Sequence, residues 1–506
     1  MNDLRAAAAA VVAVRLPGPS LDARSAALLR TMPFAGFTLF AENVASLEAV
    51  RELTDALRSC YASGLPPVIA IDQEGGPVVR LHAGVERIPS MMALGAVGDA
   101  LLAQRVGEQI ALDLRRAGVN VNFAPVLDVT VERNNTVIGT RSFGSDPDVV
   151  TRLGGALAKG LSCGGIVPTY KHFPGHGSTE IDSHLDLPAI DIDEVTFRSR
   201  DLAPFMALLP GAPAVMTAHI LLRALDPRRP ATLSPHVLTD LLRTQIGFAG
   251  VCFTDSLHMQ AIVKYIGVVE GAIAALAAGA DCVLLTGELD LAVTCVETIV
   301  EAVEDGTLSE QRLVQAAARM ATLRASLAQP LPLDTPAVHR GVGREAARRA
   351  VTLVRGEGGA DATACLVISF ESVTDQGAEG LRREFPSLVA QAPALLEWRA
   401  PLDPEDGVAE QILERLAQTS RRPILLMRRA HIYPAQARVA ARVLAAHPDA
   451  LVVSLREPYD IALFPQARHL LCAYDDGPAS IGGLADVLFG GSPPLGRLPV
   501  EFAAVR

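Results

Sequence analysis

The chain has 506 residues, half of them apolar and a fifth charged, which is typical of a globular protein and not of a disordered one. This length exceeds what one hydrophobic core usually supports, so we expect two domains. The net charge of −11 argues against a nucleic-acid partner, which would require a basic face, but it is compatible with a neutral carbohydrate.

Seven cysteines are scattered along the chain without a CxxC pair, and several lie inside apolar runs. We therefore predict reduced, buried thiols, which indicate the cytoplasm. The apolar stretch at residues 6–13 lacks the basic region and cleavage site of a signal peptide. No run of about 18 uncharged apolar residues occurs, so no membrane span is expected.

Short apolar runs alternate with segments of helical apolar spacing from residue 8 to about residue 330. This alternation predicts a (β/α)8 barrel at residues 1–330, and the catalytic groups of such barrels lie at the carboxyl ends of the strands. Polar residues directly after each run are therefore the candidates for a site. The eight predicted strands are residues 11–14, 36–40, 67–71, 119–125, 166–170, 214–218, 250–254 and 282–285.

Two acidic residues, two glycines and an arginine follow the third predicted strand, in the sequence DQEGGPVVR from Asp72 to Arg80. Paired glycines let a backbone approach a ligand closely, and Asp72 could accept hydrogen bonds from two hydroxyl groups of a ligand. The alternative is a turn with a solvated acidic pair.

After the fourth strand, Asp128 could be an inward-facing hydrogen-bonding group that shapes the pocket, either by a structural use or by contact with a ligand. Arg141 follows it with a planar fork of donors suited to amide or hydroxyl oxygens. An isolated loop arginine, however, is commonly a surface residue.

Residues 171–184, KHFPGHGSTEIDSH, contain one lysine, three histidines and two acidic residues directly after the fifth predicted strand. Pro174 and the glycines at 175 and 177 exclude a helix, and the apolar alternation of a strand is absent, so we predict a long loop. Its glycines would permit movement on substrate binding. A loop so rich in titratable groups, after a buried strand, is a candidate active site.

Within this segment, we expect Lys171 and His172 to act as hydrogen-bond donors at the strand end, because an ammonium buried without partners would be costly. His176 could instead fix the loop. Asp182 and His184 are one residue apart and would lie on the same side of an extended chain, where the carboxylate could orient the imidazole. A histidine held in this way can donate a proton and take one back near neutral pH.

Two further polar residues follow the sixth and seventh strands. His219 could line the pocket, or it could be a core histidine with its hydrogen bonds satisfied internally. Asp255 ends an apolar strand, where a carboxylate without partners would be destabilising, so we predict a functional role for it.

The chain changes character at about residue 331. Three prolines and an arginine-rich helix at 340–349 predict a linker and helix at 331–350. Beyond it, apolar runs at 364–368, 423–427, 451–453 and 470–473 alternate with helical segments and predict a smaller α/β domain with a mostly parallel sheet at 351–506. This region has no glycine fingerprint for a dinucleotide.

Residues 171–184 resemble the signature loop of the glycoside hydrolase family 3 β-N-acetylhexosaminidases of the NagZ-like branch, which reads K-H-F-P-G-H-G and then D-S-H. The stretches at 72–80, 141–143 and 254–259 are similar to other motifs of that family. The resemblance is strong over the barrel and weak over the second domain. Pro77 stands where the family usually has an arginine, and Ser256 where many members have a second aspartate.

This resemblance implies a retaining exo-β-N-acetylglucosaminidase that needs no cofactor or metal and acts on small N-acetylglucosaminides such as cell-wall fragments. It implies Asp255 as the nucleophile and His184, oriented by Asp182, as the acid and base. Ser256 spares Asp255 a like-charged neighbour, which should keep it ionised. The implied substrate-binding residues are Asp72, Arg80, Arg141, Lys171, His172 and His219.

Other functions remain open from the sequence alone. A β-N-acetylglucosaminide phosphorylase differs only in its acceptor, and a β-glucosidase of the wider family would lack the D-S-H loop. A metal-dependent hydrolase could use His172, His176, His184 and Asp255, although the usual HxH pair on the first strand is absent. A non-catalytic sugar-binding protein would be indicated by loss of Asp255 or His184, and both are present.

Overall fold

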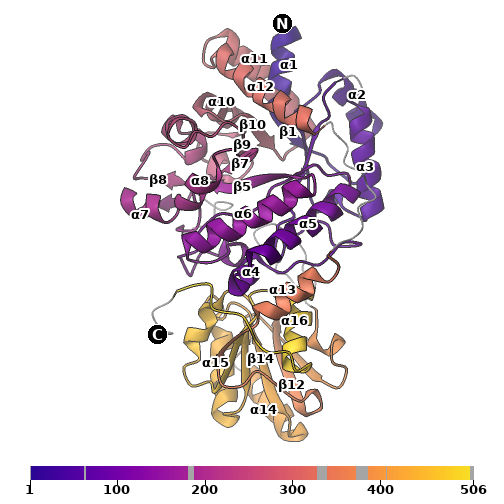
Figure 1. Cartoon of the computed structure of the whole chain (residues 1–506), viewed down its shortest axis with the longest axis vertical. Coiled ribbons are helices and arrows are strands. Elements are labelled where there is room, and N and C mark those ends of the chain that lie inside the picture. The colour runs from indigo at the N-terminus through magenta and orange to yellow at the C-terminus, as the bar shows by residue number, and fades with distance from the viewer. Residues whose placement is uncertain are drawn as a thin grey trace.

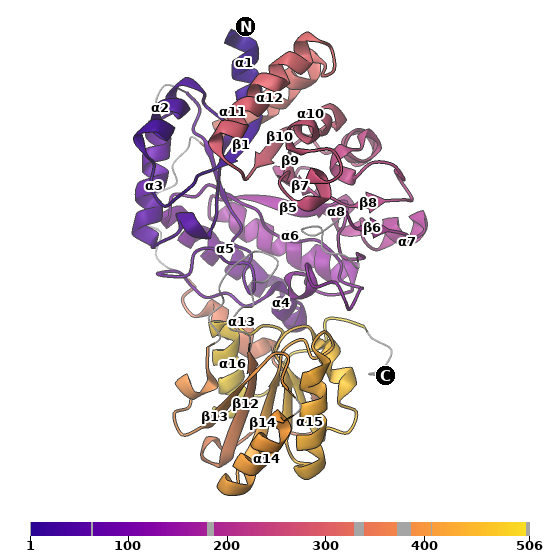
Figure 2. The same cartoon turned by 180° about the vertical axis from the view of Figure 1, so that it is seen from behind.

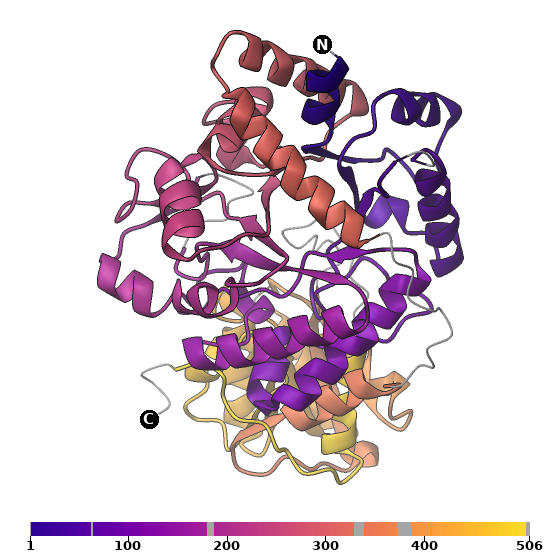
Figure 3. The same cartoon turned by 45° about the horizontal axis from the view of Figure 1, so that its top comes forward.

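The computed structural model describes residues 2–61, 64–179, 187–327, 339–371, 386–405 and 407–501. Within these residues, eight parallel strands close into a barrel surrounded by helices (Figures 1 and 3). The predicted fold class, a (β/α)8 barrel followed by a smaller α/β domain, is confirmed. In their order around the barrel the strands are β1 (Val12–Arg15), β2 (Gly36–Leu39), β3 (Val68–Ile71), β4 (Val121–Asn122), β5 (Val167–Phe173), β7 (Ala214–Thr217), β9 (Val251–Ser256) and β10 (Cys282–Leu285).

The barrel helices follow the apolar spacing of the sequence. In α3, for example, Ser46 accepts a hydrogen bond from the amide of Ala49 at the first turn, and the buried residues fall on one face. The larger helices of this region are α2 (Ala23–Thr31), α3 (Leu47–Ser59), α4 (Met91–Val97), α5 (Ala100–Arg116), α6 (Pro147–Cys163), η4 (His236–Gln245), α10 (Val268–Ala278), α11 (Leu289–Glu304) and α12 (Glu310–Ser326).

Strand β5 runs three residues further than the sequence predicts, because its backbone finds partners on both sides. The amide of Lys171 donates to the carbonyl of Pro125 at 3.1 Å, and the carbonyl of Phe173 accepts from the amide of Ala218 at 2.7 Å. The expected loop therefore begins at Pro174. A polar strand end is tolerated here because buried carboxylates pair with its side chains, which the sequence pattern does not reveal.

The second domain is built on a six-stranded sheet within the described residues. Alternate residues of its central strands face opposite layers: Leu366 and Ile368 pack with α14 (Val408–Thr419) and α15 (Pro434–Ala446), and Val367 packs with α16 (Pro478–Leu488). All neighbours are parallel except β11, which pairs antiparallel with β16. The order is β11 (Thr352–Arg355), β16 (His469–Cys472), β15 (Leu451–Ser454), β14 (Arg422–Met427), β12 (Cys365–Glu371) and β13 (Leu396–Pro401).

Helix α13 (Val342–Ala350) and the barrel helix α4 lie at the junction of the two domains (Figures 1 and 2). Met92 of α4 belongs to the same apolar cluster as one face of the second sheet. The C-terminal segment also reaches back to the barrel, where the amide of Ser145 donates to the carbonyl of Pro499 at 3.0 Å. The predicted domain limits stay a prediction, since residues 328–338 lie outside the described part.

The structure bears on two further predictions, reduced thiols and the lack of a membrane span. All seven cysteines are free thiols, and five of them are buried. No helix among the described residues is both long and apolar enough to cross a membrane.

Candidate active site

A pocket of about 440 Å³ opens at the carboxyl ends of the barrel strands. Strands β3, β4, β5 and β9, with the segments that follow them, supply its predicted residues. The fold thus brings together side chains that lie up to 183 positions apart in the sequence. Of the predicted site residues, those that line this pocket are Asp72, Arg80, Arg141, Lys171, His172 and Asp255.

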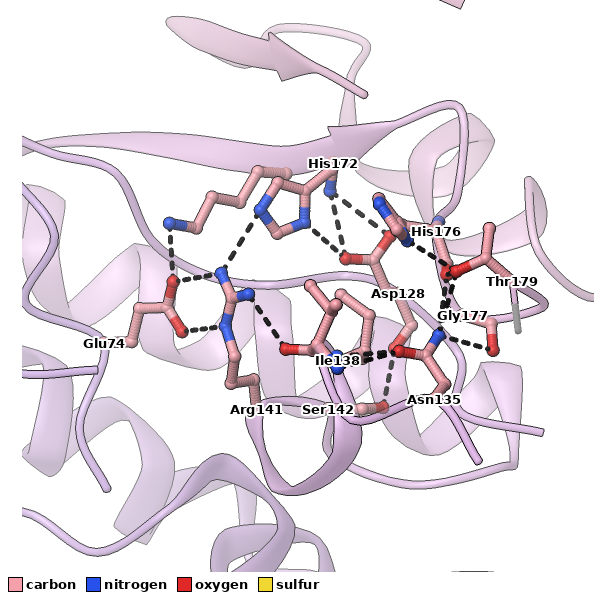
Figure 4. A network of polar contacts seen from close by, with 12 residues as sticks. Glu74, Asp128, Asn135, Ile138, Arg141, Ser142, His172, His176, Gly177 and Thr179 are labelled. Carbon is pink, nitrogen blue, oxygen red and sulfur yellow. Dashed lines mark hydrogen bonds and ion pairs between the residues drawn. The ribbon is translucent and has the colours of Figure 1, made fainter. Parts of the chain in front are cut away.

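Glu74 links two of the predicted substrate-binding cations beneath the pocket (Figure 4). Its side chain is 1% exposed, and its Oε1 lies 2.5 Å from Nζ of Lys171 and 2.8 Å from Nη2 of Arg141. Nε of Arg141 donates to the second oxygen at 2.9 Å, which completes a two-point contact. Burial would raise the pKa of Glu74, but Arg141 and Lys171 together lower it.

Asp72 lies closer to the pocket opening and is 16% exposed. Its carboxylate accepts from Nζ of Lys171 at 2.7 Å and lies 3.5 Å from Nη2 of Arg80. Burial opposes ionisation, yet these cations lower the pKa of Asp72 to about 2. Asp72 is therefore an ionised acceptor at neutral pH. In turn, the carboxylates of Asp72 and Glu74 raise the pKa of Lys171 despite the burial of its ammonium group.

Asp128 anchors the start of the loop that follows β5 (Figure 4). It is fully buried, with Oδ2 2.6 Å from Nδ1 of His172 and Oδ1 accepting from the amide of His176 at 2.7 Å. The second ring nitrogen of His172, Nε2, lies 3.2 Å from Nη2 of Arg141. Of the two roles left open for Asp128, the structure shows one: it orients His172 and shapes the loop.

His176 is buried against this loop, and burial lowers its pKa to about 4. Its Nδ1 lies 2.9 Å from the hydroxyl of Thr179, and Nδ2 of Asn135 donates to the carbonyl of His176 at 3.0 Å. A Cβ on Gly177 would collide with the carbonyl of Val129. The glycine at this position therefore allows the close packing of two loops. The predicted movement of the loop on substrate binding stays a prediction.

Asp255 is the penultimate residue of β9, and its partly exposed side chain lines the pocket. The amide of Ser256 donates to its Oδ1 at 2.7 Å, and the hydroxyl of Ser256 lies 2.6 Å from that of Thr286. The neutral serine is thus held by the neighbouring strand end. This agrees with the expectation that residue 256 brings no second negative charge to Asp255.

His219 occupies a buried position beside the end of β9. Its Nδ1 lies 2.8 Å from the hydroxyl of Thr232, and its Nε2 lies 2.9 Å from the carbonyl of Ser256. This placement favours the internally bonded core histidine over contact with a sugar. Its predicted part in substrate binding stays untested.

Asp182 and His184, the predicted acid–base pair, lie outside the described residues. Conversely, the pocket includes residues that the sequence analysis did not select. Arg15 and Arg80 place their guanidinium groups 5.3 and 5.7 Å from the ring centre of Phe40, and Arg15 pairs with Glu42. Arg15 ends β1 and Phe40 follows β2, so inspection of every strand end would have found them.

Among the described residues, no three His, Cys, Asp or Glu side chains are arranged to hold a metal ion. The two ring nitrogens of His172 face Asp128 and Arg141.

Residues 6–323 match the glycosyl hydrolase family 3 N-terminal domain. The chain belongs to this family. The resemblance inferred from the motifs is thereby confirmed, and the family members are glycoside hydrolases.

Similar proteins carry related names. The chain is 36% identical over 388 residues to beta-hexosaminidase A of Pseudoalteromonas piscicida, an alignment that covers 67% of this chain but only 64% of that protein. It is 39% identical over 300 residues to a beta-hexosaminidase of Nitrosomonas eutropha, which covers 57% of this chain and 84% of the relative.

A solved structure extends the similarity to both domains. The glycoside hydrolase family 3 beta-N-acetylglucosaminidase from Paenibacillus sp. str. FPU-7 superimposes with a TM-score of 0.90 and is 33% identical. The superposition covers 98% of each chain, so the two-domain arrangement is common to both.

Proposed function

We propose that the chain is a retaining exo-β-N-acetylglucosaminidase that hydrolyses terminal β-linked N-acetylglucosamine. One observation carries the proposal: the carboxylate of Asp255 shares a single pocket with the ion-paired groups Asp72, Lys171 and Arg141. The names of the similar proteins support the choice of an acetamido sugar over glucose.

The buried ion pairs suit a polyhydroxylated ligand. Asp72 is ionised and can only accept hydrogen bonds, whereas Lys171, Arg80 and Arg141 can only donate them. Because each group is already held by an oppositely charged neighbour, little reorganisation is needed when the sugar arrives. We infer that these four groups orient the terminal sugar.

We assign the nucleophile to Asp255. Its Oδ1 is held by the amide of Ser256 on the same strand, which fixes the direction of the carboxylate. In the proposed reaction a carboxylate oxygen bonds to the anomeric carbon as the glycosidic bond breaks, and water then cleaves the glycosyl–Asp255 ester with net retention.

We assign the acid and base to His184, with Asp182 holding its tautomer. His184 would protonate the departing oxygen and later take a proton from the attacking water. In the sequence both residues follow closely on Thr179, whose hydroxyl contacts Nδ1 of His176, a pocket residue, and accepts a hydrogen bond from Nδ2 of Asn135. A neutral or cationic histidine would not repel the anionic nucleophile as a second carboxylate would.

We further propose that the substrates are N-acetylglucosamine-bearing cell-wall fragments and that the protein acts in the cytoplasm. The free thiols support a reducing compartment. A concave pocket of about 440 Å³ at the barrel end is compatible with a short glycan.

The test is nitrophenol release from the aryl β-N-acetylglucosaminide and from the aryl β-glucoside, each with and without phosphate. The proposal predicts preference for the acetamido sugar and a loss of at least about a thousandfold in Asp255→Ala. The exposed variant Asp449→Asn is the control.

The other outcomes identify the alternatives. A phosphate-dependent rate with a sugar phosphate product would make the protein a phosphorylase, and preference for the glucoside would make it a glucosidase. Undiminished turnover in Asp255→Ala would overturn the site assignment.

A further inference from the structure

We propose that Arg429 and Glu457, both in the second domain, are positioning residues that hold Arg141 in the active site. The inference rests on the proposed function for the part played by Arg141 in sugar binding. It concerns the loop at residues 129–145, which follows barrel strand β4 and carries Arg141.

Arg429 and Glu457 form a two-point ion pair at the domain junction. Nε and Nη2 of Arg429 lie 3.0 and 2.9 Å from the two carboxylate oxygens, and Glu457 is buried. Although burial would raise the pKa of Glu457, Arg429 and Arg456 hold it well below its usual range. The carboxylate therefore stays charged, and both side chains keep one geometry.

The same pair contacts the barrel loop at two places. Nη2 of Arg429 donates to the carbonyl of Thr136 at 3.3 Å. Glu457 packs on Gly139 so closely that a Cβ there would collide with its carboxylate, and the φ of +40° at Gly139 also favours glycine. The loop and the ion pair are thus fitted to each other.

Thr136 and Gly139, which contact the ion pair, lie close to Arg141 in the same loop. Gly139 begins the short helical turn η2 (Gly139–Arg141), and Nη1 of Arg141 donates to the carbonyl of Val137 at 3.1 Å. A shift of residues 136–139 would therefore move the guanidinium group that contacts Glu74 and His172. Figure 4 shows this turn against the ion-paired network.

Arg429 itself has an unusual backbone. Its φ of +54° lies in the left-handed region, which costs a residue with a Cβ some conformational energy. It follows strand β14, and Glu457 follows the adjacent parallel strand β15. The carboxyl edge of such a sheet is the usual place for a small ligand, and here these two residues contact the barrel loop.

The matched control is a second ion pair between the domains that touches no active-site loop. Arg105 of α5 and Glu345 of α13 are 3.0 Å apart. We compare Glu457→Gln with Glu345→Gln, each in the wild-type chain and in Arg141→Lys, and measure kcat/KM on the aryl β-N-acetylglucosaminide.

If Glu457 acts through Arg141, Glu457→Gln lowers kcat/KM about tenfold to a hundredfold in the wild-type chain and has little further effect in Arg141→Lys. Glu345→Gln changes it by less than about twofold. Equal losses from Glu457→Gln in both backgrounds, or no loss in the wild-type chain, would overturn the proposal.

A second readout is independent of turnover. Hydrogen–deuterium exchange of the amides at 136–141 is expected to quicken in Glu457→Gln and in Gly139→Ala, and to stay unchanged in Glu345→Gln. Unchanged exchange in both Glu457→Gln and Gly139→Ala would contradict the positioning role. If the wild-type chain fails to cleave the N-acetylglucosaminide, the proposed function is wrong. The exchange experiment still decides whether the Arg429–Glu457 ion pair holds the loop.

Discussion

At the scale of single residues, the site is a chain of alternating buried charges. Lys171 lies between Asp72 and Glu74, and Glu74 is shared with Arg141. Such networks are costly to desolvate, and their benefit here is a fixed arrangement of donors and acceptors before the sugar binds. Removing one member leaves the others uncompensated.

Glu74→Gln tests this network. It is expected to destabilise the fold by about 3 kcal/mol, because Lys171 and Arg141 would lose a shared buried counter-ion. Urea denaturation measures the effect. The exposed pair Arg468–Asp449 supplies the control, since Asp449→Asn should change stability by less than about 0.5 kcal/mol. Similar values for both variants would contradict the importance of the network.

His176 gives the fold a pH dependence of known sign. Its pKa is about 4 in the folded protein against 6.5 in the unfolded chain, so the unfolded state takes up a proton first as pH falls. Stability from the neutral ring is complete above pH 6.5 and is lost as pH falls towards 4, by up to about 3 kcal/mol.

The measurement is urea denaturation of His176→Asn and wild type from pH 7 to pH 4. The variant should lose less stability over this range, and the exposed His236→Asn should follow the wild type. Parallel curves for His176→Asn and wild type would show that the buried ring does not control this dependence.

Some site residues can be predicted from the sequence because a charged side chain at the end of an apolar strand is unfavourable unless it has a function. Asp255 ends an apolar strand and does line the pocket. Glu74 was missed because an acidic pair in a turn is compatible with solvent, and only the fold brings Lys171 and Arg141 to it. For His219, the sequence left two roles open, and its partners Thr232 and Ser256 come from other elements.

At the scale of elements, the barrel strands follow from apolar runs, but the end of β5 does not. Lys171 and His172 are polar and interrupt the apolar run before Phe173, so the composition and the lack of apolar alternation indicate a loop. Their strand conformation depends on backbone partners at Pro125 and Ala218, far away in the sequence. In the second domain the four named runs match strands, whereas the edge strands β11 and β13 are less buried and give a weaker signal.

Gly177→Ala tests the close packing of the loops after β4 and β5. The added methyl group would meet the carbonyl of Val129, so a loss of about 2 kcal/mol is expected, with a lower kcat/KM because the Asp128–His176 contact is strained. Thermal unfolding and turnover measure both effects. Gly359→Ala, where a Cβ has open space, should leave stability nearly unchanged; equal losses would count against the packing argument.

At the scale of the whole molecule, the second domain is part of the barrel's support. Met92, Ala93 and Ala96 of α4 are buried in the apolar cluster of the second sheet, and the C-terminal segment bonds to Ser145. The sequence predicts two domains of these classes, but it does not predict the contacts between them, because complementary surfaces leave no local pattern.

Truncation near residue 335 should therefore lower the melting temperature and reduce kcat/KM at least about tenfold, since α4 becomes exposed and the Arg141 loop loses its contacts. Circular dichroism and the aryl substrate assay measure both. Full turnover by a stable, isolated barrel would show that the second domain supports neither the fold nor the site.

In the proposed reaction Asp255 forms a covalent bond with the sugar. The most direct measurement is peptide mass spectrometry after reaction with a fluorinated N-acetylglucosaminyl fluoride, which forms the ester quickly and releases it slowly. We expect one sugar adduct on the peptide that contains Asp255, and none in Asp255→Ala. An adduct on another residue, or continued turnover with no adduct at all, would contradict it.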